Sequence, residues 1–514
     1  MSKTIIIIGA GLAGLSAALQ AAENGCNVKL VSSLPSERAQ SVMAEGGINA
    51  ALNTKDENDS PEEHFTDTIK AACGLADPNA VWGMTQAAPE LVHWLLKLGV
   101  KFNMSGYDDV DLRNFGGQKK KRTAFAQSDT GKQIMTAMID AVRRKEASGM
   151  VGRVSHHSFL TLRLCGNICC GCVIRDEYSQ RIVELPGDAV IVATGGMHGL
   201  FGNTTGSLSN TGEVTAELFR LGVPLANGEM IQYHPTTVKC GGKRMLISEA
   251  ARGEGGRLFA MKDGKQWYFM EEKYPELGNL MPRDITAREI WKVSHESEVF
   301  LDMTEISEEI ISNKLSGLAD DCMTYLHKDI RKEPVSVLPG IHYFMGGILV
   351  DEQHRTPIQN LYAAGECCAQ YHGANRLGGN SLLGALYGGR VAAKSACEQA
   401  DVVDLSCATQ IDFPPASQIS EIKQLNKVMQ ETMGVVRNEN TLLNGIQTVQ
   451  ALTGNLPLLG MAVLKSALAR KESRGAHWRE DYPKSNDDDY LKTTVARFDG
   501  KQIQISFVPV PERR

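Results

Sequence analysis

Arg376 lies in a glycine-rich stretch whose residue types could bind an anion. The stretch, residues 363–389, joins a strand-like run to a loop with His372, Asn375 and Arg376, and then to a small-residue segment that predicts a helix start at Asn380. Backbone N–H groups at a helix start are unpaired and attract anions. A guanidinium in the same loop can hold a carboxylate through two parallel hydrogen bonds. We therefore expect an anionic or electron-rich group here, with a carboxylate at Arg376.

A second glycine-rich turn lies at the start of the chain. Residues 4–8 form a continuous β-branched run, which stops at Gly9-Ala-Gly11-Leu-Ala-Gly14 and is followed by helical spacing. In a strand–GxGxxG–helix unit, the first two glycines let the backbone approach a pyrophosphate, and the third lets helix and strand pack closely. The context predicts a dinucleotide site, and the alternative is a tight turn without a ligand.

Two further strand ends are predicted near this turn. The strand at 27–31 ends at Ser32 and Ser33, where such units usually carry an acid for the ribose, so ribose recognition through Ser32 is expected to be weaker. Residues 188–196 predict another buried parallel strand that runs into a glycine turn. Glu213 then opens a predicted helix beside the same site.

Length and composition limit the class of protein. A chain of 514 residues is expected to form two or three domains. The net charge is −6 and charges of both signs are interspersed, so the sequence has no basic patch that would indicate nucleic-acid binding. No apolar run approaches the roughly 20 residues of a membrane helix, and no secretion signal is recognised, so we expect a cytoplasmic chain without a direct membrane span. Twelve cysteines without a regular framework indicate reduced thiols.

Four of the cysteines lie close together in the chain, at Cys165, Cys169, Cys170 and Cys172. Their spacing matches neither a ferredoxin nor a CxxCH haem motif, and they fall in a strand-like stretch, so we expect no metal site. Without a redox metal of its own, the chain must exchange electrons with another molecule. The basic run 119–122 is expected to be a solvated surface, with a docking patch as the alternative.

The remaining candidates are too far apart in sequence for local chemistry and could converge only in the fold. They are the segments 40–47 (QSVMAEGG), 115–117 (FGG), 233–236 (YHPT), 246–256 (LISEAARGEGG), 281–284 (MPRD) and 341–347 (IHYFMGG). Together with the Arg376 stretch, and in this order, they resemble the flavoprotein subunits of succinate dehydrogenase and fumarate reductase, with L-aspartate oxidase as a close cousin.

This resemblance implies an α/β fold: a Rossmann-like FAD-binding domain with an inserted α+β capping domain and a C-terminal helical domain. The implied limits are 1–232 with 343–405 for the FAD-binding domain, 233–342 for the capping domain, and 406–514 for the helical domain with an extended tail. The looser composition at 412–418 (DFPPASQ) is typical of such a boundary. Helical patterns follow at 418–432 and 440–470, and a strand-like tail at the end. The SRGAH segment there is interpreted as packing and docking.

The resemblance also implies FAD as the cofactor. Where many family members carry a histidine bonded covalently to FAD, this chain has Gln40, which predicts noncovalent binding and favours fumarate reduction over succinate oxidation. The expected cofactor-binding residues are Gly9, Ala10, Gly11, Ala13, Gly14, Ser32, Ser33, Ser41, Ala44, Glu45, Gly46, Gly47, Ala193, Thr194, Gly195, Glu213, Glu366, Asn380, Ser381 and Leu382.

By the same resemblance, the substrate is the fumarate and succinate pair. One carboxylate is assigned to Arg376 and His342, the other to His234 and Ser248, where Ser248 replaces a common threonine but keeps its hydroxyl. Phe115 is expected to pack on the substrate with the Gly117 amide assisting. Arg283 is assigned as the proton donor, resupplied by Glu249 and Arg252, which are spaced as on one helical turn. FAD supplies the hydride chemistry.

Two other functions remain open at this point. L-aspartate oxidase is opposed by Phe115, because those enzymes carry a glutamate there that can meet an ammonium group. A flavin electron carrier with a decayed site is opposed by the complete set of candidate residues. For electrons, the resemblance implies an iron–sulfur subunit or another external donor, and such a subunit could also bring the chain to a membrane.

Overall fold

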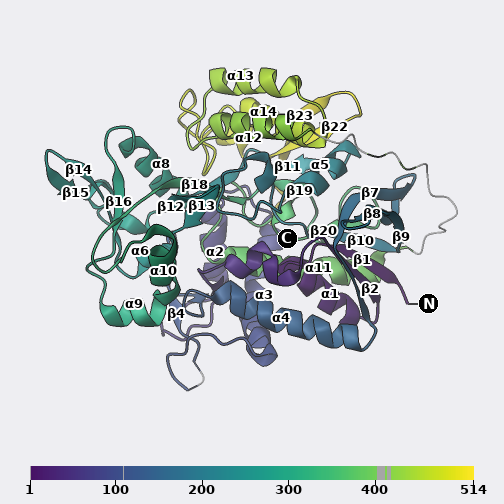
Figure 1. Ribbon diagram of the computed structural model, residues 1–514, viewed down its shortest axis with the longest axis horizontal. Coiled ribbons are helices and arrows are strands. Elements are labelled where there is room, and N and C mark those ends of the chain that lie inside the picture. Colours follow the sequence, from purple (N-terminus) through teal and green to yellow (C-terminus); the bar gives the residue numbers. More distant parts are fainter. Residues whose placement is uncertain (1, 108, 402–410, 412, 414–417) are drawn as a thin grey trace.

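A parallel sheet of five strands lies at the right of the molecule in Figure 1. The computed structural model describes residues 2–107, 109–401, 411, 413 and 418–514. The sheet order is β20-β10-β1-β2-β6, and every neighbouring pair is parallel. The strands are β1 (Thr4–Ile8), β2 (Asn27–Ser32), β6 (Val151–Ser155), β10 (Ala189–Val192) and β20 (Leu361–Ala363). The strands predicted at 4–8, 27–31 and 188–192 are therefore confirmed.

Strand β1 is buried on both faces, as its unbroken apolar run indicates. Ile5 and Ile7 pack into a core formed with helices, whereas Ile6 and Ile8 pack into a second core against a small antiparallel sheet. The helices are α1 (Leu12–Glu23), α4 (Thr130–Ala147) and α11 (Asn380–Gln399). The small sheet is β7 (His157–Cys165), β8 (Ile168–Asp176) and β9 (Ile182–Pro186).

Beside this unit lies a mixed region of strands and short helices, at the left of Figure 1. It contains one three-stranded and one four-stranded sheet, and its core is formed by residues from Ile247 to Val337 together with Phe115. The strands are β12 (Ile231–Cys240), β13 (Lys243–Leu246), β18 (Leu338–Phe344), β14 (Arg257–Lys262), β15 (Lys265–Trp267), β16 (Val299–Asp302) and β17 (Val335–Ser336). The helices are α6 (Glu249–Gly253), α7 (Phe269–Lys273), α8 (Arg283–Val293), α9 (Glu308–Lys314) and α10 (Ser316–Asp321).

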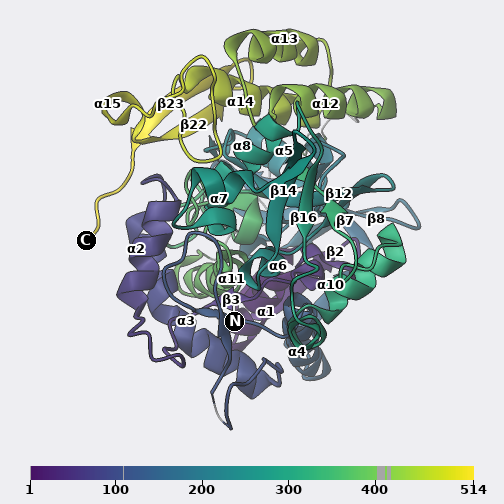
Figure 2. The same ribbon diagram turned by 90° about the vertical axis from the view of Figure 1, so that its left-hand side faces the viewer.

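The C-terminal part forms a helical layer over the rest (Figure 1) and ends in a tail that runs alongside α2 (Figure 2). The helical pattern predicted over 440–470 forms two helices, because the chain turns before Asn455 at Gly454, whose φ is +108°. The helices are α12 (Ile419–Thr432), α13 (Glu439–Gln450), α14 (Asn455–Ala469) and α15 (Asp487–Tyr490). The tail strand is confirmed as β23 (Ile503–Pro509). The boundary predicted at 405/406 lies outside the described residues, and the other domain limits stay predictions.

The remaining elements connect these parts. Ser60 and Asp77 cap the two helices α2 (Pro61–Ala71) and α3 (Pro78–Leu98), each of which has proline at its first position. A further helix is α5 (Glu213–Arg220). A mixed sheet carries β21 (Cys368–Ala369), β19 (Gly347–Leu349), β11 (Leu225–Ala226), β22 (Lys492–Phe498) and β23 (Ile503–Pro509), and a smaller one carries β3 (Ile48–Asn49), β5 (Thr123–Ala124) and β4 (Leu112–Arg113).

Two expectations about surface and thiols need correction. Within the basic run 119–122, Arg122 is fully buried and forms ion pairs of 2.8 Å with Asp59 and with Asp67, so the prediction of a solvated run is wrong at this position.

Cys165 is disulfide-bonded, whereas the other described cysteines are free. Among the described helices, none has the length and apolar character that crossing a membrane requires.

Candidate active site

One cavity of about 920 Å³ joins the ends of the parallel strands to the mixed region. Its volume is at the upper end of the usual range for small-molecule sites. Most of the predicted cofactor residues line it: Gly9, Ala10, Gly11, Ala13, Ser32, Ser33, Ser41, Ala44, Glu45, Gly46, Gly47, Ala193, Thr194, Gly195, Glu213, Glu366, Ser381 and Leu382. Gly14 and Asn380 are the two predicted cofactor residues that do not.

The GxGxxG turn has a different steric reason for each glycine. A Cβ on Gly9 would lie 2.2 Å from Ala193 O, and one on Gly14 would lie 1.9 Å from Gly9 O, so Gly14 serves the packing of helix on strand. Gly11 has only side-chain atoms at 3.6 Å or more around it, which leaves room for a ligand. Gly11, the residue before α1, has no side chain to cap the helix. Leu12 N donates to Ser41 Oγ at 3.2 Å, and the next N–H groups of the helix have no side-chain partner among the described residues. The turn fits a pyrophosphate.

The start of α11 is a second uncapped helix N-terminus in the same cavity. Gly379 precedes it with φ +84°, and no side chain caps the helix. Ser381 and Leu382 line the cavity. Asn380 instead points into the protein, where its side chain accepts from Asn49 and lies 2.9 Å from both His64 Nε2 and Thr68 Oγ1. Asn380 therefore anchors the helix start from behind.

The segment 40–47 lies along the cavity because two elements hold its backbone. The guanidinium of Arg113 donates to the carbonyls of Glu45 and Gly46. Gly131, at the start of α4, donates to Ala44 O at 2.7 Å, and a Cβ there would lie 2.1 Å from Ser41 O. The position of this segment is thus fixed without any ligand.

Glu45 is a buried carboxyl within that segment. Burial raises its pKa to about 8, and the nearby Asp321 adds to the rise, while Arg113 opposes it. Its Oε2 has no hydrogen-bond partner among the described residues. A carboxyl in this state is neutral at pH 7 and can donate to a ligand.

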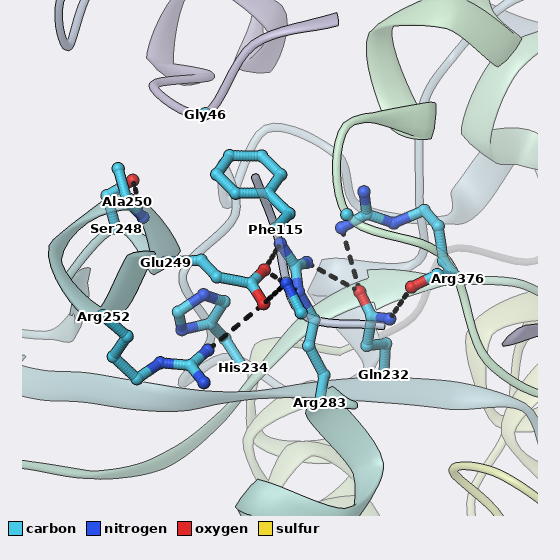
Figure 3. A network of polar contacts seen from close by, with 12 residues as sticks. Gly46, Phe115, Gln232, His234, Ser248, Glu249, Ala250, Arg252, Arg283 and Arg376 are labelled. Carbon is cyan, nitrogen blue, oxygen red and sulfur yellow. Dashed lines mark hydrogen bonds and ion pairs between the residues drawn. The ribbon is translucent and has the colours of Figure 1, made fainter. Parts of the chain in front are cut away.

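Phe115 forms the roof over the polar end of the cavity (Figure 3). Its ring packs under Gly46, where an added Cβ would lie 2.9 Å from the ring. The next residue, Gly116, donates its amide to Glu249 Oε1 at 3.0 Å. Gly117 has φ +83° and does not line the cavity.

Two arginines converge at the centre of this end (Figure 3). Arg283 Nη1 and Arg376 Nη2 both donate to Oε1 of Gln232, at 3.0 and 2.9 Å. Gln232 is fully buried and is itself fixed by donating to Asn375 Oδ1 and Arg376 O. Nε of Arg376 is buried without a hydrogen-bond partner among the described residues. Burial lowers the pKa of Arg376 to about 9, and the neighbouring charge of Arg283 adds to this effect. The pair therefore favours an anion.

Arg252, Glu249 and Arg283 form a continuous row of ion pairs (Figure 3). Glu249 Oε2 accepts from Arg283 at 2.6 Å, and Glu249 Oε1 lies 3.4 Å from Arg252 Nη2. Burial alone would raise the pKa of Glu249, but the two arginines and the Gly116 amide hold it below the usual value. Arg252 does not line the cavity and lies one step behind Glu249. The row can pass a proton towards the cavity.

Two neutral histidines and one hydroxyl complete the polar end. The His234 and His342 rings meet edge to face with centroids 5.2 Å apart, and burial, followed by the nearby Arg283, lowers both pKa values well below the usual value. Nδ1 of His342 lies 2.8 Å from Thr205 Oγ1, and Nδ1 of His234 bonds to the backbone of Thr236, which leaves each Nε2 for a ligand. Ser248 Oγ accepts from Ala250 N as the cap of α6, so its own proton remains available.

The structure brings most of the predicted catalytic and substrate-binding residues to one cavity, except Gly117 and Arg252, and it adds neighbours that the sequence reasoning missed. Gln232, Arg113 and Thr205 were not singled out, and Tyr343, whose ring lies under the Arg376 guanidinium at 4.3 Å, was noted only as part of a segment. Gln232 lies in the buried part of β12, but the sequence of this strand, IQYHPTTVKC, is mostly polar and gave no local signal that would single it out. Among the described residues, no group of acids, cysteines and histidines could hold a metal ion.

The chain is similar to known flavoproteins over its whole length. A family model described as an FAD binding domain matches residues 4–382, and one described as a fumarate reductase flavoprotein C-terminal region matches residues 452–513. The succinate dehydrogenase flavoprotein subunit of Bacillus subtilis is 38% identical, covering 100% of this chain and 98% of that protein. L-aspartate oxidase of Streptomyces coelicolor is 30% identical, covering 100% and 94%. The Escherichia coli quinol fumarate reductase FrdA structure superposes with a TM-score of 0.90 at 27% identity, covering 99% and 97%.

Proposed function

The chain belongs to the family of succinate dehydrogenase and fumarate reductase flavoprotein subunits, and from that premise we propose that it interconverts fumarate and succinate with FAD. The observation that carries this proposal is the convergence of Arg283 and Arg376 on Gln232 in the cavity that also contains the GxGxxG turn. The two buried guanidinium groups repel each other, and a dianion bound between them would be attracted by both.

Fumarate requires two clamped carboxylates. We assign one to Arg376, whose free Nε and polarised Nη2 can bind it bidentately, with Nε2 of His342 beside it. The other is assigned to His234 and to the Ser248 hydroxyl. Both histidines are neutral, so they act as hydrogen-bond donors without adding charge. Phe115 closes the site above and excludes water.

The reduction of fumarate needs one hydride and one proton on neighbouring carbons. Bound FAD, once reduced by an external electron donor, would supply the hydride from its N5. We assign the proton to Arg283, whose guanidinium lies in the cavity and pairs with Glu249. A guanidinium is a weak acid, but the carbon next to a carboxylate becomes a strong base once hydride has been added. Glu249 and Arg252 then return a proton to Arg283 from the side away from the cavity. In total, fumarate, one hydride and one proton give succinate.

The residues around FAD support noncovalent binding. Gln40 lines the cavity where family members carry the bonded histidine, and an amide cannot form that bond. We therefore propose that the chain holds FAD through the GxGxxG turn, the 44–47 backbone and the start of α11. Without the covalent bond, which in the family raises the flavin potential, fumarate reduction is the favoured direction.

We propose that electrons enter or leave through another molecule. We propose an iron–sulfur electron-transfer subunit as that partner. The family supports this choice, since the similar Bacillus subtilis protein is named a flavoprotein subunit. Such a partner would also be the link to a membrane.

L-aspartate oxidase is the second candidate, favoured by the 30% identical relative. Phe115 opposes it, because the roof of the site is a buried phenyl ring without a carboxylate for a substrate ammonium. One experiment distinguishes the two functions. The purified protein is reduced with a low-potential dye, and fumarate, succinate or L-aspartate is added separately while the flavin spectrum is followed. We expect rapid reoxidation by fumarate and weak reduction of the oxidised flavin by succinate. Reduction of oxidised flavin by L-aspartate instead would establish the second function.

A further inference from the structure

The hairpin of β12 and β13, two strands that lie side by side in Figure 1, joins the dicarboxylate end of the cavity to solvent. Its base carries two of the proposed clamps, because His234 lies on β12 and Ser248 follows β13. Its tip is the turn 241–242, where a Cβ on either glycine would meet no atom of the described residues within 4 Å. Cys240 and Lys243, which flank this turn, still line the cavity. The cavity therefore follows the hairpin from the proposed clamps to an open mouth.

The two ends of the hairpin are close enough for electrostatic attraction to act between them. From His234 to Cys240 the strand rises by at most about 20 Å, at roughly 3.3 Å per residue. This exceeds the Debye length of about 8 Å at physiological ionic strength but not that of about 30 Å at 0.01 M. Charges at the tip can therefore act on an anion before it reaches the clamps, and their effect must depend on ionic strength.

The hairpin carries cations without matching acids. Residues 231–248 contain Lys239, Lys243 and Arg244 but neither aspartate nor glutamate. Both lysines are exposed, and none of the three cations forms an ion pair with a carboxylate of the described residues. Lys239 and Arg244 are direct partners across the antiparallel strands. Like charges in this arrangement destabilise a strand pair, so these charges do not serve the pairing of β12 with β13.

Arg244 brings one of these charges to the cavity wall. Its Nε donates to Thr237 Oγ1 at 2.5 Å, and its Nη2 donates to the carbonyls of Thr237 and Leu338 at 3.2 and 3.3 Å. The side chain lies over Gly340 of β18, where an added Cβ would be 2.6 Å from Arg244 Nε. These neutral acceptors orient the guanidinium but leave its charge uncompensated. Because Arg244 lines the cavity with Lys243, the wall next to the mouth is cationic.

A second basic hairpin in the same region differs from this one. Strands β14 and β15 pair Lys262 with Lys265, but the turn between them carries Asp263, and Lys262 Nζ lies 4.7 Å from the centre of the Trp267 ring. None of these four residues lines the cavity. The charges of the second hairpin are therefore partly offset by its own residues, unlike those of β12 and β13.

We propose that the β12–β13 hairpin guides a dicarboxylate from solvent into the cavity, with Lys243 at the mouth and Arg244 on the wall. The hairpin attracts a dianion before the clamps bind it, which raises the association rate. The inference rests on the proposed function, because it takes the ligand of the site to be a dicarboxylate. It assigns no part in hydride or proton transfer to either residue.

The test is the association rate of malonate, a dicarboxylate without the CH–CH bond that the reaction requires. Malonate is mixed with the oxidised, FAD-bound protein by stopped flow, and binding is followed by the change in flavin absorbance. At about 0.01 M ionic strength, Lys243→Gln should lower the association rate constant roughly 3- to 10-fold and Lys243→Glu roughly 10- to 100-fold. At about 1 M salt, where the Debye length is about 3 Å, both variants should agree with the wild type within about two-fold. The dissociation rate constant should change little, as is usual for a charge at the rim of a site.

Lys265→Gln is the matched control, because Lys265 is an exposed lysine of the second hairpin and does not line the cavity. It should bind malonate as the wild type does at every ionic strength. An association rate for Lys243→Glu within two-fold of wild type at low salt would overturn the guiding role, and so would a loss that persists at high salt.

This outcome can be distinguished from that of the proposed reaction. Slower malonate association in Lys243→Glu would support the inference even in a protein that fails to reduce fumarate. Reduction of fumarate together with unchanged malonate association would overturn the inference alone. A wild-type protein that binds no malonate would contradict both.

Discussion

Arg283 and Arg376 donate to one shared oxygen, Oε1 of Gln232, although they lie 93 positions apart in the sequence. This oxygen fixes the distance between the proposed proton donor and the proposed carboxylate clamp. It also offsets part of the repulsion between two buried cations. A dicarboxylate is thus bound to a pair of arginines that the protein has already oriented.

Gln232→Leu should disturb both arginines without changing their charges. Hydrogen bonds to charged groups contribute about 1.5–3 kcal/mol, so kcat/KM for fumarate should fall roughly 10- to 150-fold. Gln232→Glu should bind between the arginines as an internal carboxylate and raise KM more than Gln232→Leu does. Steady-state kinetics on protein with full flavin content tests this. A fall in kcat/KM of less than three-fold for both variants would show that Gln232 does not position the pair.

Glu45 predicts a specific dependence of stability on pH. Its pKa rises from 4.5 in the unfolded chain to about 8 in the folded protein, so the folded state binds the proton more tightly. Between about pH 4.5 and 8, Glu45 ionises in the unfolded chain but stays protonated in the folded protein. The free energy of unfolding therefore falls progressively over this range. Glu45→Gln cannot ionise, so its melting temperature should match the wild type near pH 5 and exceed it increasingly up to pH 8.

Thermal unfolding of the flavin-free protein between pH 5 and 9 measures this difference. The matched control is Glu276→Gln, at an exposed position, which should follow the wild type at every pH. A difference for Glu45→Gln that stays constant with pH would contradict the assignment of a raised pKa to Glu45.

Arg122 predicts a large effect on stability far from the reaction. Its ion pairs with Asp59 and Asp67 are buried, and removing one partner of such a group leaves uncompensated charge. Arg122→Met should destabilise the protein by about 3–5 kcal/mol, seen as a clear fall in the unfolding midpoint. Arg143→Met breaks an exposed pair with Glu37 and should have little effect. Equal midpoints for the two variants would be incompatible with a structural role for Arg122.

Gln40 predicts the fate of the flavin on denaturation. Precipitation of the purified protein with acid should release the yellow colour into the supernatant, because the amide forms no bond to FAD. The measurement is the flavin absorbance of supernatant and pellet. Colour that remains in the washed pellet would mean that another residue carries the flavin covalently.

The sequence predicted what depends on local patterns. The unit from Thr4 to Gly14 was recognised because strand, turn and helix are encoded within a few residues, and each of its first and last glycines meets a backbone oxygen as the motif requires. The scattered site residues were assigned only through family resemblance. No local pattern could show that His234, Arg283 and Arg376 would face one cavity.

What the sequence could not predict depends on distant partners. Arg122 looked solvated within a basic run, because its acids at Asp59 and Asp67 are more than fifty residues away. Gln232 was predicted only as the last residue of the first FAD-binding segment, because the two arginines around its side chain, Arg283 and Arg376, are distant in the sequence. Four residues, 451–454, separate α13 from α14, and the positive φ of Gly454 at the end of this turn cannot be read from the helical pattern.

Arg283 as proton donor is the central claim, and single-turnover reoxidation tests it most directly. Wild type and Arg283→Ala are reduced anaerobically and mixed with fumarate while flavin absorbance is followed, and the dependence of the rate on fumarate concentration gives binding separately from chemistry. We expect Arg283→Ala to bind fumarate yet to reoxidise roughly 10²- to 10⁴-fold more slowly, the contribution of a positioned acid. Reoxidation of Arg283→Ala within ten-fold of wild type would contradict the account.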